Sequence, residues 1–103
     1  MALQLRPSCE WCDKDLPPAA TDARICTYEC TFCAECVETV LFNVCPNCGG
    51  GFAPRPIRPA RAWRPGVCLQ NQPVAAERVH LKWPRDEVAA FVQQVRDIEP
   101  ADR

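Results

Sequence analysis

Eight of the nine cysteines lie in the first half of the chain, at short and regular spacings. In order, the spacing is C-x2-C-x13-C-x3-C-x2-C-x2-C-x8-C-x2-C, formed by Cys9, Cys12, Cys26, Cys30, Cys33, Cys36, Cys45 and Cys48. Such pairs suit zinc, because a tight turn directs both thiolates at one ion and structural zinc takes four ligands in a tetrahedron. Eight thiolates therefore predict two Zn²⁺ ions, each held by four cysteines.

Disulfides and an iron–sulfur cluster are the competing uses of these cysteines. The first ten residues lack the apolar run of a signal peptide, so we expect a cytoplasmic location, where thiols stay reduced. An odd total also fits eight ligands and one spare thiol, Cys68, better than a closed disulfide set. An iron–sulfur cluster bound by residues 26–36 is the chemical alternative to zinc. That run lacks the ferredoxin order of spacings and leaves the flanking pairs needing a separate site.

The spacing leaves open which cysteines share an ion. Sequential pairing joins the first four cysteines in one site and the last four in another. A third arrangement closes residues 26–36 on a single centre. Interleaved pairing gives a first site and a second site made respectively of Cys9, Cys12, Cys33, Cys36 and of Cys26, Cys30, Cys45, Cys48. All-cysteine sites leave no open coordination position, so the sequence predicts structural rather than catalytic zinc and no catalytic residues.

The elements around the ligands are predicted to be few and short. Aromatic residues make up 8% of the chain, a lean supply for a core, so a small domain here needs metal to fold. Residues 24–29 are expected to form a short strand. Residues 35–43 are expected to form a short helix that ends at Asn43. Residues 1–52 are thus predicted to be a small α+β zinc-binding module.

The second half of the chain has a different composition. Residues 53–65 are rich in proline and arginine and are predicted to be a linker, with an arginine at every third position (Arg55, Arg58, Arg61 and Arg64). Residues 66–103 are predicted to be a strand–helix tail. Within it, residues 78–83 alternate as a strand does, residues 66–70 are a candidate partner strand, and residues 85–98 carry the apolar spacing of an amphipathic helix.

The charges are distributed unevenly along the chain. Residues 1–52 carry three basic and seven acidic side chains, a net of −4, whereas residues 53–83 carry six basic and one acidic, a net of +5. The acidic head disfavours nucleic acid, and the basic linker keeps a nucleic-acid-associated zinc protein as the alternative. No stretch is long enough to span a membrane, so no membrane partner is expected. The helix at 85–98 offers an apolar face for a homodimer.

The ligand spacing resembles the RING-type cross-brace, with Cys30 where the usual RING has histidine. More closely, the motifs "LRPSCEWCDKDLPP", "DARIC", "ECTFCAEC" and "CPNCGG" resemble a family of short bacterial cysteine-rich proteins, a domain of unknown function with a RING-like or treble-clef-like zinc fold. The resemblance covers residues 5 to about 60. It implies a RING-like module with two zinc ions and interleaved pairing, and it implies no activity.

The RING resemblance also implies a surface for a protein partner. Trp11, Val40 and Pro46 match positions near which RING ligases bind their conjugating enzyme. Gly49 stands where activating ligases often carry a basic residue, so a ubiquitin ligase is the distant alternative. Cys68 is expected to be an inert thiol and His80 a surface residue. The predicted function is therefore a non-catalytic zinc-binding module for protein interaction.

Overall fold

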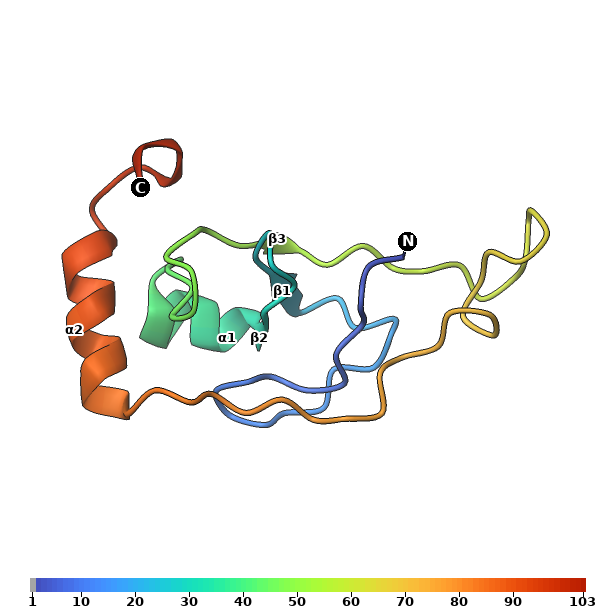
Figure 1. The fold of residues 1–103 in the computed structure, drawn as a ribbon, viewed down its shortest axis with the longest axis horizontal. Coiled ribbons are helices and arrows are strands. Elements are labelled where there is room, and N and C mark those ends of the chain that lie inside the picture. The colour runs from blue at the N-terminus through green and yellow to red at the C-terminus, as the bar shows by residue number, and fades with distance from the viewer. Residues whose placement is uncertain (1) are drawn as a thin grey trace.

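A small antiparallel sheet lies at the centre of the computed structural model, which describes residues 2–103 (Figure 1). Its strand order is β2-β1-β3, and both strand pairs are antiparallel. The elements in chain order are β1 (Ala23–Ile25), β2 (Thr31–Cys33), α1 (Ala34–Cys36), the π-helical η1 (Val37–Leu41), β3 (Ala53–Pro54), α2 (Arg85–Val95) and the 3-10 helix η2 (Pro100–Asp102). The fold is thus a small α+β structure, as the sequence predicts.

The β1–β2 hairpin is closed by a tight turn that carries two cysteines. Ile25 pairs with Thr31, and the chain between them turns through Cys26 and Cys30. The amide of Cys26 donates to the carbonyl of Cys30 at 3.2 Å, and Glu29 takes a positive φ of 69° to close the turn. The strand predicted at 24–29 is therefore confirmed in type and ends before this turn.

The helix predicted at 35–43 is confirmed with shifted ends. It runs as α1 and then η1, so the helical residues extend from Ala34 to Leu41. Phe42 and Asn43 adopt left-handed φ angles of 47° and 62°, and the amide of Asn43 donates to the carbonyl of Val37 at 3.1 Å. This reversal ends the helix and directs the chain into the last cysteine pair.

One hydrophobic core joins the cysteine-rich head to the C-terminal helix. Phe32 is fully buried and meets Phe52 edge to face, with 5.4 Å between ring centroids. Val88 and Val92 of α2 belong to the same buried cluster as Phe32 and Leu41. Both valines carry the apolar spacing on which the helix at 85–98 was predicted. The helix is confirmed, although its α-helical part ends at Val95.

The strands predicted at 66–70 and 78–83 are wrong, since residues 2–103 form no strand after Ala53–Pro54. Residues 66–70 fold into turns instead, because the carbonyl of Cys68 accepts from the amide of Gln72 at 2.9 Å. Residues 78–83 are extended but make, within the described chain, a single backbone hydrogen bond to the head, from the amide of Leu81 to the carbonyl of Glu10 at 3.1 Å. Alternation there reflects one side of the segment lying against the head.

The predicted linker also contributes to the sheet. Residues Ala53–Pro54 form β3, in which Ala53 pairs with Ile25 and Pro54 with Arg24. Proline is tolerated because β3 is an edge strand, where the missing N–H faces away from the sheet. Among the described residues, no helix is long and apolar enough to cross a membrane.

Candidate metal centre

Four cysteine sulfurs from two separate segments meet beside the sheet. Cys9 and Cys12 come from the N-terminal loop, Cys33 from the end of β2 and Cys36 from α1. Their Sγ atoms all lie within 4.8 Å of one another, and the Cys12 and Cys33 sulfurs are 3.8 Å apart. A tetrahedral zinc with Zn–S bonds of about 2.3 Å needs sulfurs about 3.8 Å apart. The first sulfur group therefore fits a four-coordinate zinc.

The N-terminal loop is folded so that both of its sulfurs point to one place. The amide of Asp13 donates to the carbonyl of Cys9 at 2.9 Å, and Asp13 takes a positive φ of 63°. The amide of Cys9 donates back to the carbonyl of Lys14 at 2.9 Å. Backbone hydrogen bonds therefore hold this turn without any contribution from a metal.

A second group is formed by Cys26, Cys45 and Cys48, whose sulfurs also lie within 4.8 Å of one another. The turn at Cys45 closes through the amide of Gly49, which donates to the Cys45 carbonyl at 2.7 Å. Gly49 has a φ of 80°, which a residue without Cβ adopts at little cost. Two amides, those of Tyr28 and Gly50, donate to the sulfurs of Cys26 and Cys48 at 3.3 and 3.4 Å.

Cys30 lies beside the second group and interacts with its sulfurs. Hydrogen bonding with the thiol of Cys45 is the largest influence on Cys30 and lowers its pKa to about 5. The same contact raises the pKa of the Cys45 thiol, and burial adds to that effect. Cys30 is not among the three sulfurs that lie within 4.8 Å of one another, and its contact with Cys45 places it next to them.

Burial keeps several of the other thiols protonated when no metal is bound. It raises the pKa of Cys9 and of Cys36, and it raises the pKa of Cys26 to about 11. For Cys12, the effect of burial is outweighed by hydrogen bonds from the Lys14 amide and neighbouring thiols, so its pKa is lowered. A metal must displace these protons, so its affinity depends on pH. All nine cysteines are free of disulfides.

Glu10 is a buried carboxylate that connects the two sulfur groups. It accepts a hydrogen bond from the Thr31 backbone amide at 2.6 Å, from the Arg6 guanidinium at 2.8 Å and from the Asn47 side-chain amide at 3.4 Å. Burial raises its pKa, and the Thr31 and Arg6 contacts oppose that effect. These partners come from the N-terminal loop, β2 and the Cys45–Cys48 turn. Sequence reasoning missed Glu10, although Arg6 four residues earlier was a signal of a pair.

The three candidate partner-binding residues lie beneath or beside the C-terminal segment. Trp11 is half-buried, and the guanidinium carbon of Arg85 lies 4.4 Å from its ring centroid. Pro46 is buried and lines a cavity of about 190 Å³ together with Trp83, Glu87, Val88 and Phe91. Val40 is half-buried at the edge of the same core.

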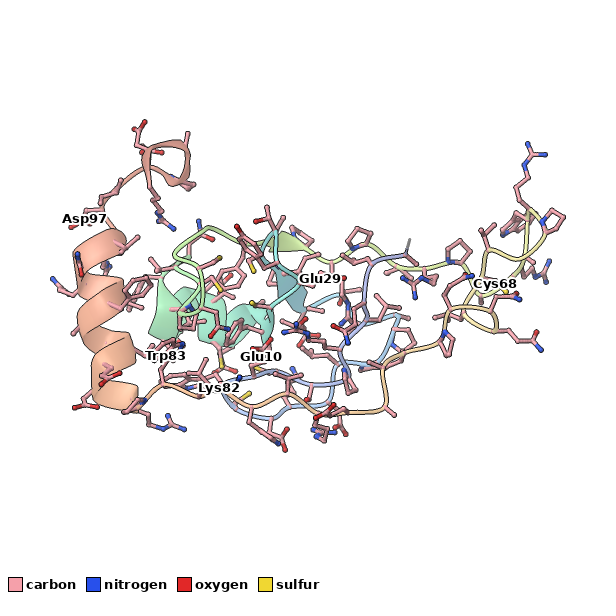
Figure 2. All side chains as sticks on the ribbon, in the orientation of Figure 1. Glu10, Glu29, Cys68, Lys82, Trp83 and Asp97 are labelled. Atoms are coloured by element: carbon pink, nitrogen blue, oxygen red, sulfur yellow. The ribbon has the colours of Figure 1, made fainter. Side chains whose placement is uncertain are left out.

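Residues 80–103 contact both cysteine turns. The Trp83 indole donates to the side-chain oxygen of Asn47 at 3.0 Å (Figure 2 shows Trp83 near Glu10 and Lys82). A Cβ on Gly49 would meet the Phe91 ring at 3.4 Å. The Arg103 guanidinium donates to the carbonyls of Asn43 and Gly49 at 2.8 and 3.0 Å. The chain's own C-terminal segment therefore covers this surface.

Two of the four predicted linker arginines are used to hold the chain together. The buried Arg55 guanidinium donates to the carbonyls of Arg6, Leu16 and Pro17 at 2.8, 3.2 and 3.0 Å. Burial lowers its pKa. Arg58 donates to the carbonyl of Gln72 at 2.6 Å and also to that of Leu3. Arg55 and Arg58 therefore attach the predicted linker to residues of the head.

The remaining candidates lie away from both sulfur groups. Cys68 is buried in the loop at the opposite end of the molecule from Trp83 (Figure 2), and its thiol donates to the side-chain oxygen of Asn71 at 3.1 Å. His80 is exposed, with Nδ1 3.8 Å from a carboxylate oxygen of Asp13. Neither lies within the sulfur groups.

The sulfur groups coincide with the segment that comparison assigns to a family. Residues 2–58 match the model described as "Protein of unknown function (DUF1272)". The chain belongs to this family. The DUF1272 match spans all eight clustered cysteines, and the expected cysteine-rich family of unknown function is confirmed in that form. An uncharacterized protein of Rhizobium meliloti (strain 1021) is 54% identical over 77 residues, which are 75% of this chain and 84% of that relative. No solved structure matches the chain.

Proposed function

We propose that the protein is a non-catalytic, RING-like module held by two zinc ions, and that it serves protein interaction. The observation that carries the proposal is the first sulfur group, in which four thiols lie within 4.8 Å of one another and one pair stands at the 3.8 Å spacing of a zinc tetrahedron. Cys30 would complete the second group as its fourth ligand. The two groups then interleave along the chain.

Zinc in these sites would act as a structural staple. Each ion would join two segments that are distant in sequence, the N-terminal loop with the β2–α1 junction and the β1–β2 turn with the Cys45–Cys48 turn. Binding free energies of structural zinc in small modules are about 10–16 kcal/mol, larger than the whole stability of many small domains. The lean core of this chain makes such a contribution necessary.

The ligand chemistry supports a structural role over a catalytic one. A catalytic zinc keeps an open position for water or substrate, whereas four thiolates close the tetrahedron. Amides at Tyr28 and Gly50 stabilise negative sulfur in the second group, as second-sphere hydrogen bonds do in metal sites. The protein would therefore act through its surface.

The surface over the cysteine turns supports recognition of an apolar helix. The protein's own helix α2 already lies on this surface, where Val88 and Phe91 line a cavity together with Pro46. Trp11 stacks with Arg85, and aromatic and arginine side chains commonly carry much of an interface's binding energy. A partner would present a similar apolar face, either beside α2 or in its place.

Substitution of single cysteines tests the structural role of zinc. Cys12→Ser removes an exposed ligand of the first group, and we expect it to lower the zinc content from two ions to one and to destabilise the head. Cys68→Ser is the matched control, because Cys68 lies outside both groups, and it should leave the zinc content unchanged. Equal zinc content in the two variants would contradict the proposal.

A further inference from the structure

Residues 58–72 form a loop at the end of the molecule opposite α2 (Figure 1). The molecule is 45 Å long in its longest direction. The loop is closed at its base, where the amide of Leu69 donates to the carbonyl of Pro59 at 2.9 Å and Arg58 donates to Gln72. Inside it, the side-chain amide of Gln72 donates to the carbonyl of Gly66 at 2.8 Å. The loop is therefore held in one shape.

A hollow of about 360 Å³ opens in this loop. Its walls include the apolar side chains of Pro59, Trp63 and Val67 and the arginines Arg58 and Arg64. Trp63 is 75% exposed, the largest exposed fraction among the large apolar side chains of the described residues. A loop closed by hydrogen bonds that leaves an indole exposed to solvent beside an apolar hollow indicates a binding surface.

The electrostatics of the loop favour an anion. Residues 53–76 contain four arginines and no acidic residue. Arg55 and Arg58 are bound to backbone carbonyls, which leaves Arg61 and Arg64 exposed, and neither forms an ion pair within residues 2–103. The guanidinium carbon of Arg61 lies 5.9 Å from the Trp63 ring centroid. The fitting ligand thus combines negative charge with a flat apolar group.

We propose that this hollow binds single-stranded nucleic acid, with one base stacked on Trp63 and adjacent phosphates held by Arg61 and Arg64. Aromatic side chains beside cationic ones are the usual means of binding unpaired bases without sequence preference. A duplex offers no free base face to the indole.

The acidic head does not prevent this contact, because the loop projects from it. The C-terminal helix lies at the other end of a molecule 45 Å long. At physiological salt the Debye length is about 8 Å, so most of the head's charge is screened at the loop. Of the four arginines at every third position, Arg61 and Arg64 are the two that stay exposed near Trp63.

Fluorescence anisotropy with a labelled oligothymidylate of about 15 nucleotides tests the proposal on the full zinc-loaded chain. We expect Trp63→Ala to weaken binding by about fivefold or more and Trp63→Phe to retain most of it, since one stacked base contributes roughly that factor. Tyr28→Ala is the control, because Tyr28 is 71% exposed and lies outside the hollow. It should bind as the wild type does.

The salt dependence of binding tests the two arginines independently of Trp63. Two phosphate contacts to a single strand give a slope of log K against log salt of about −1.4, hence a loss of about sevenfold between 50 and 200 mM salt. The double variant Arg61→Gln, Arg64→Gln should bind more weakly, with a slope near zero. A slope that is unchanged in this variant would overturn the assignment of the arginines.

Three further outcomes would overturn the proposal. They are the absence of oligothymidylate binding at low salt, equal affinity for a duplex of the same length, and binding that Trp63→Ala leaves unchanged while its zinc content matches the wild type. Cosedimentation with phosphatidylglycerol vesicles, without oligonucleotide binding, would instead assign the hollow to a membrane surface.

Discussion

Arg55→Met tests whether the arginine-rich segment is a structural part of the head. Methionine keeps much of the length of the side chain and removes its charge and its donors. The guanidinium makes three hydrogen bonds, at 2.8, 3.0 and 3.2 Å, to the carbonyls of Arg6, Pro17 and Leu16. The substitution would leave these carbonyls with fewer donors in a buried region.

The expected loss follows from two opposing effects. Hydrogen bonds to charged groups contribute about 1.5–3 kcal/mol each, so three contribute roughly 4–9 kcal/mol. The opposing effect is the cost of burying the Arg55 charge, which is several kcal/mol. Arg55 forms no ion pair within the described residues. The hydrogen bonds exceed the burial cost modestly, so we expect a net destabilisation of about 2–3 kcal/mol.

Urea unfolding at fixed zinc concentration, followed by circular dichroism, measures this difference. Arg64→Met is the matched control, since Arg64 is exposed, and its free energy of unfolding should stay within about 0.5 kcal/mol of the wild type. The Arg55 midpoint should fall without a change in the slope. If both variants unfold at the same midpoint, residues 53–58 are not anchored and the reasoning is refuted.

Two other predictions concern the helix and the sulfur groups. Val88→Ala should lower the free energy of unfolding in urea by about 2–3 kcal/mol, since Val88 is fully buried in the core. Val67→Ala, at an exposed position, should lower it by under about 0.5 kcal/mol. Equal losses would contradict packing of α2 against the core. Zinc affinity should rise with pH, because burial raises the pKa of Cys9 and Cys36 and both must lose a proton to bind. Each proton released on binding gives about tenfold per pH unit, so Cys9 and Cys36 together give at least about a hundredfold in competition with a chelating dye, and a pH-independent affinity would contradict that mechanism.

The elements set by local pattern were predictable from the sequence. The spacing of Val88 and Val92 predicted α2, and the left-handed turn at Asn43 follows a residue type that tolerates positive φ. The structure brings together Cys9, Cys12, Cys33 and Cys36, and separately Cys26, Cys45 and Cys48, whereas the pairing of metal ligands and Cys30 as a fourth ligand stay predictions. That each group holds a zinc ion stays a prediction.

The contacts made between distant segments were not predictable in the same way. Arg55 lies in a proline-rich stretch whose composition indicates a solvated linker, and only the fold places three carbonyls around its side chain. Residues 78–83 alternate like a strand, yet the segment lies singly on the head through Leu81 and Arg78. Glu10 gains its role from Thr31 and Asn47, which the sequence separates widely.

The metal content of the freshly purified protein is the direct test of whether two zinc ions hold the head together. Native mass spectrometry gives the mass of the folded chain with its metals, and elemental analysis identifies them. We predict two zinc ions per chain, and we predict that a chelator which removes them unfolds the head. A single metal per chain, iron with visible absorbance, or a metal-free chain that keeps its fold would contradict these predictions.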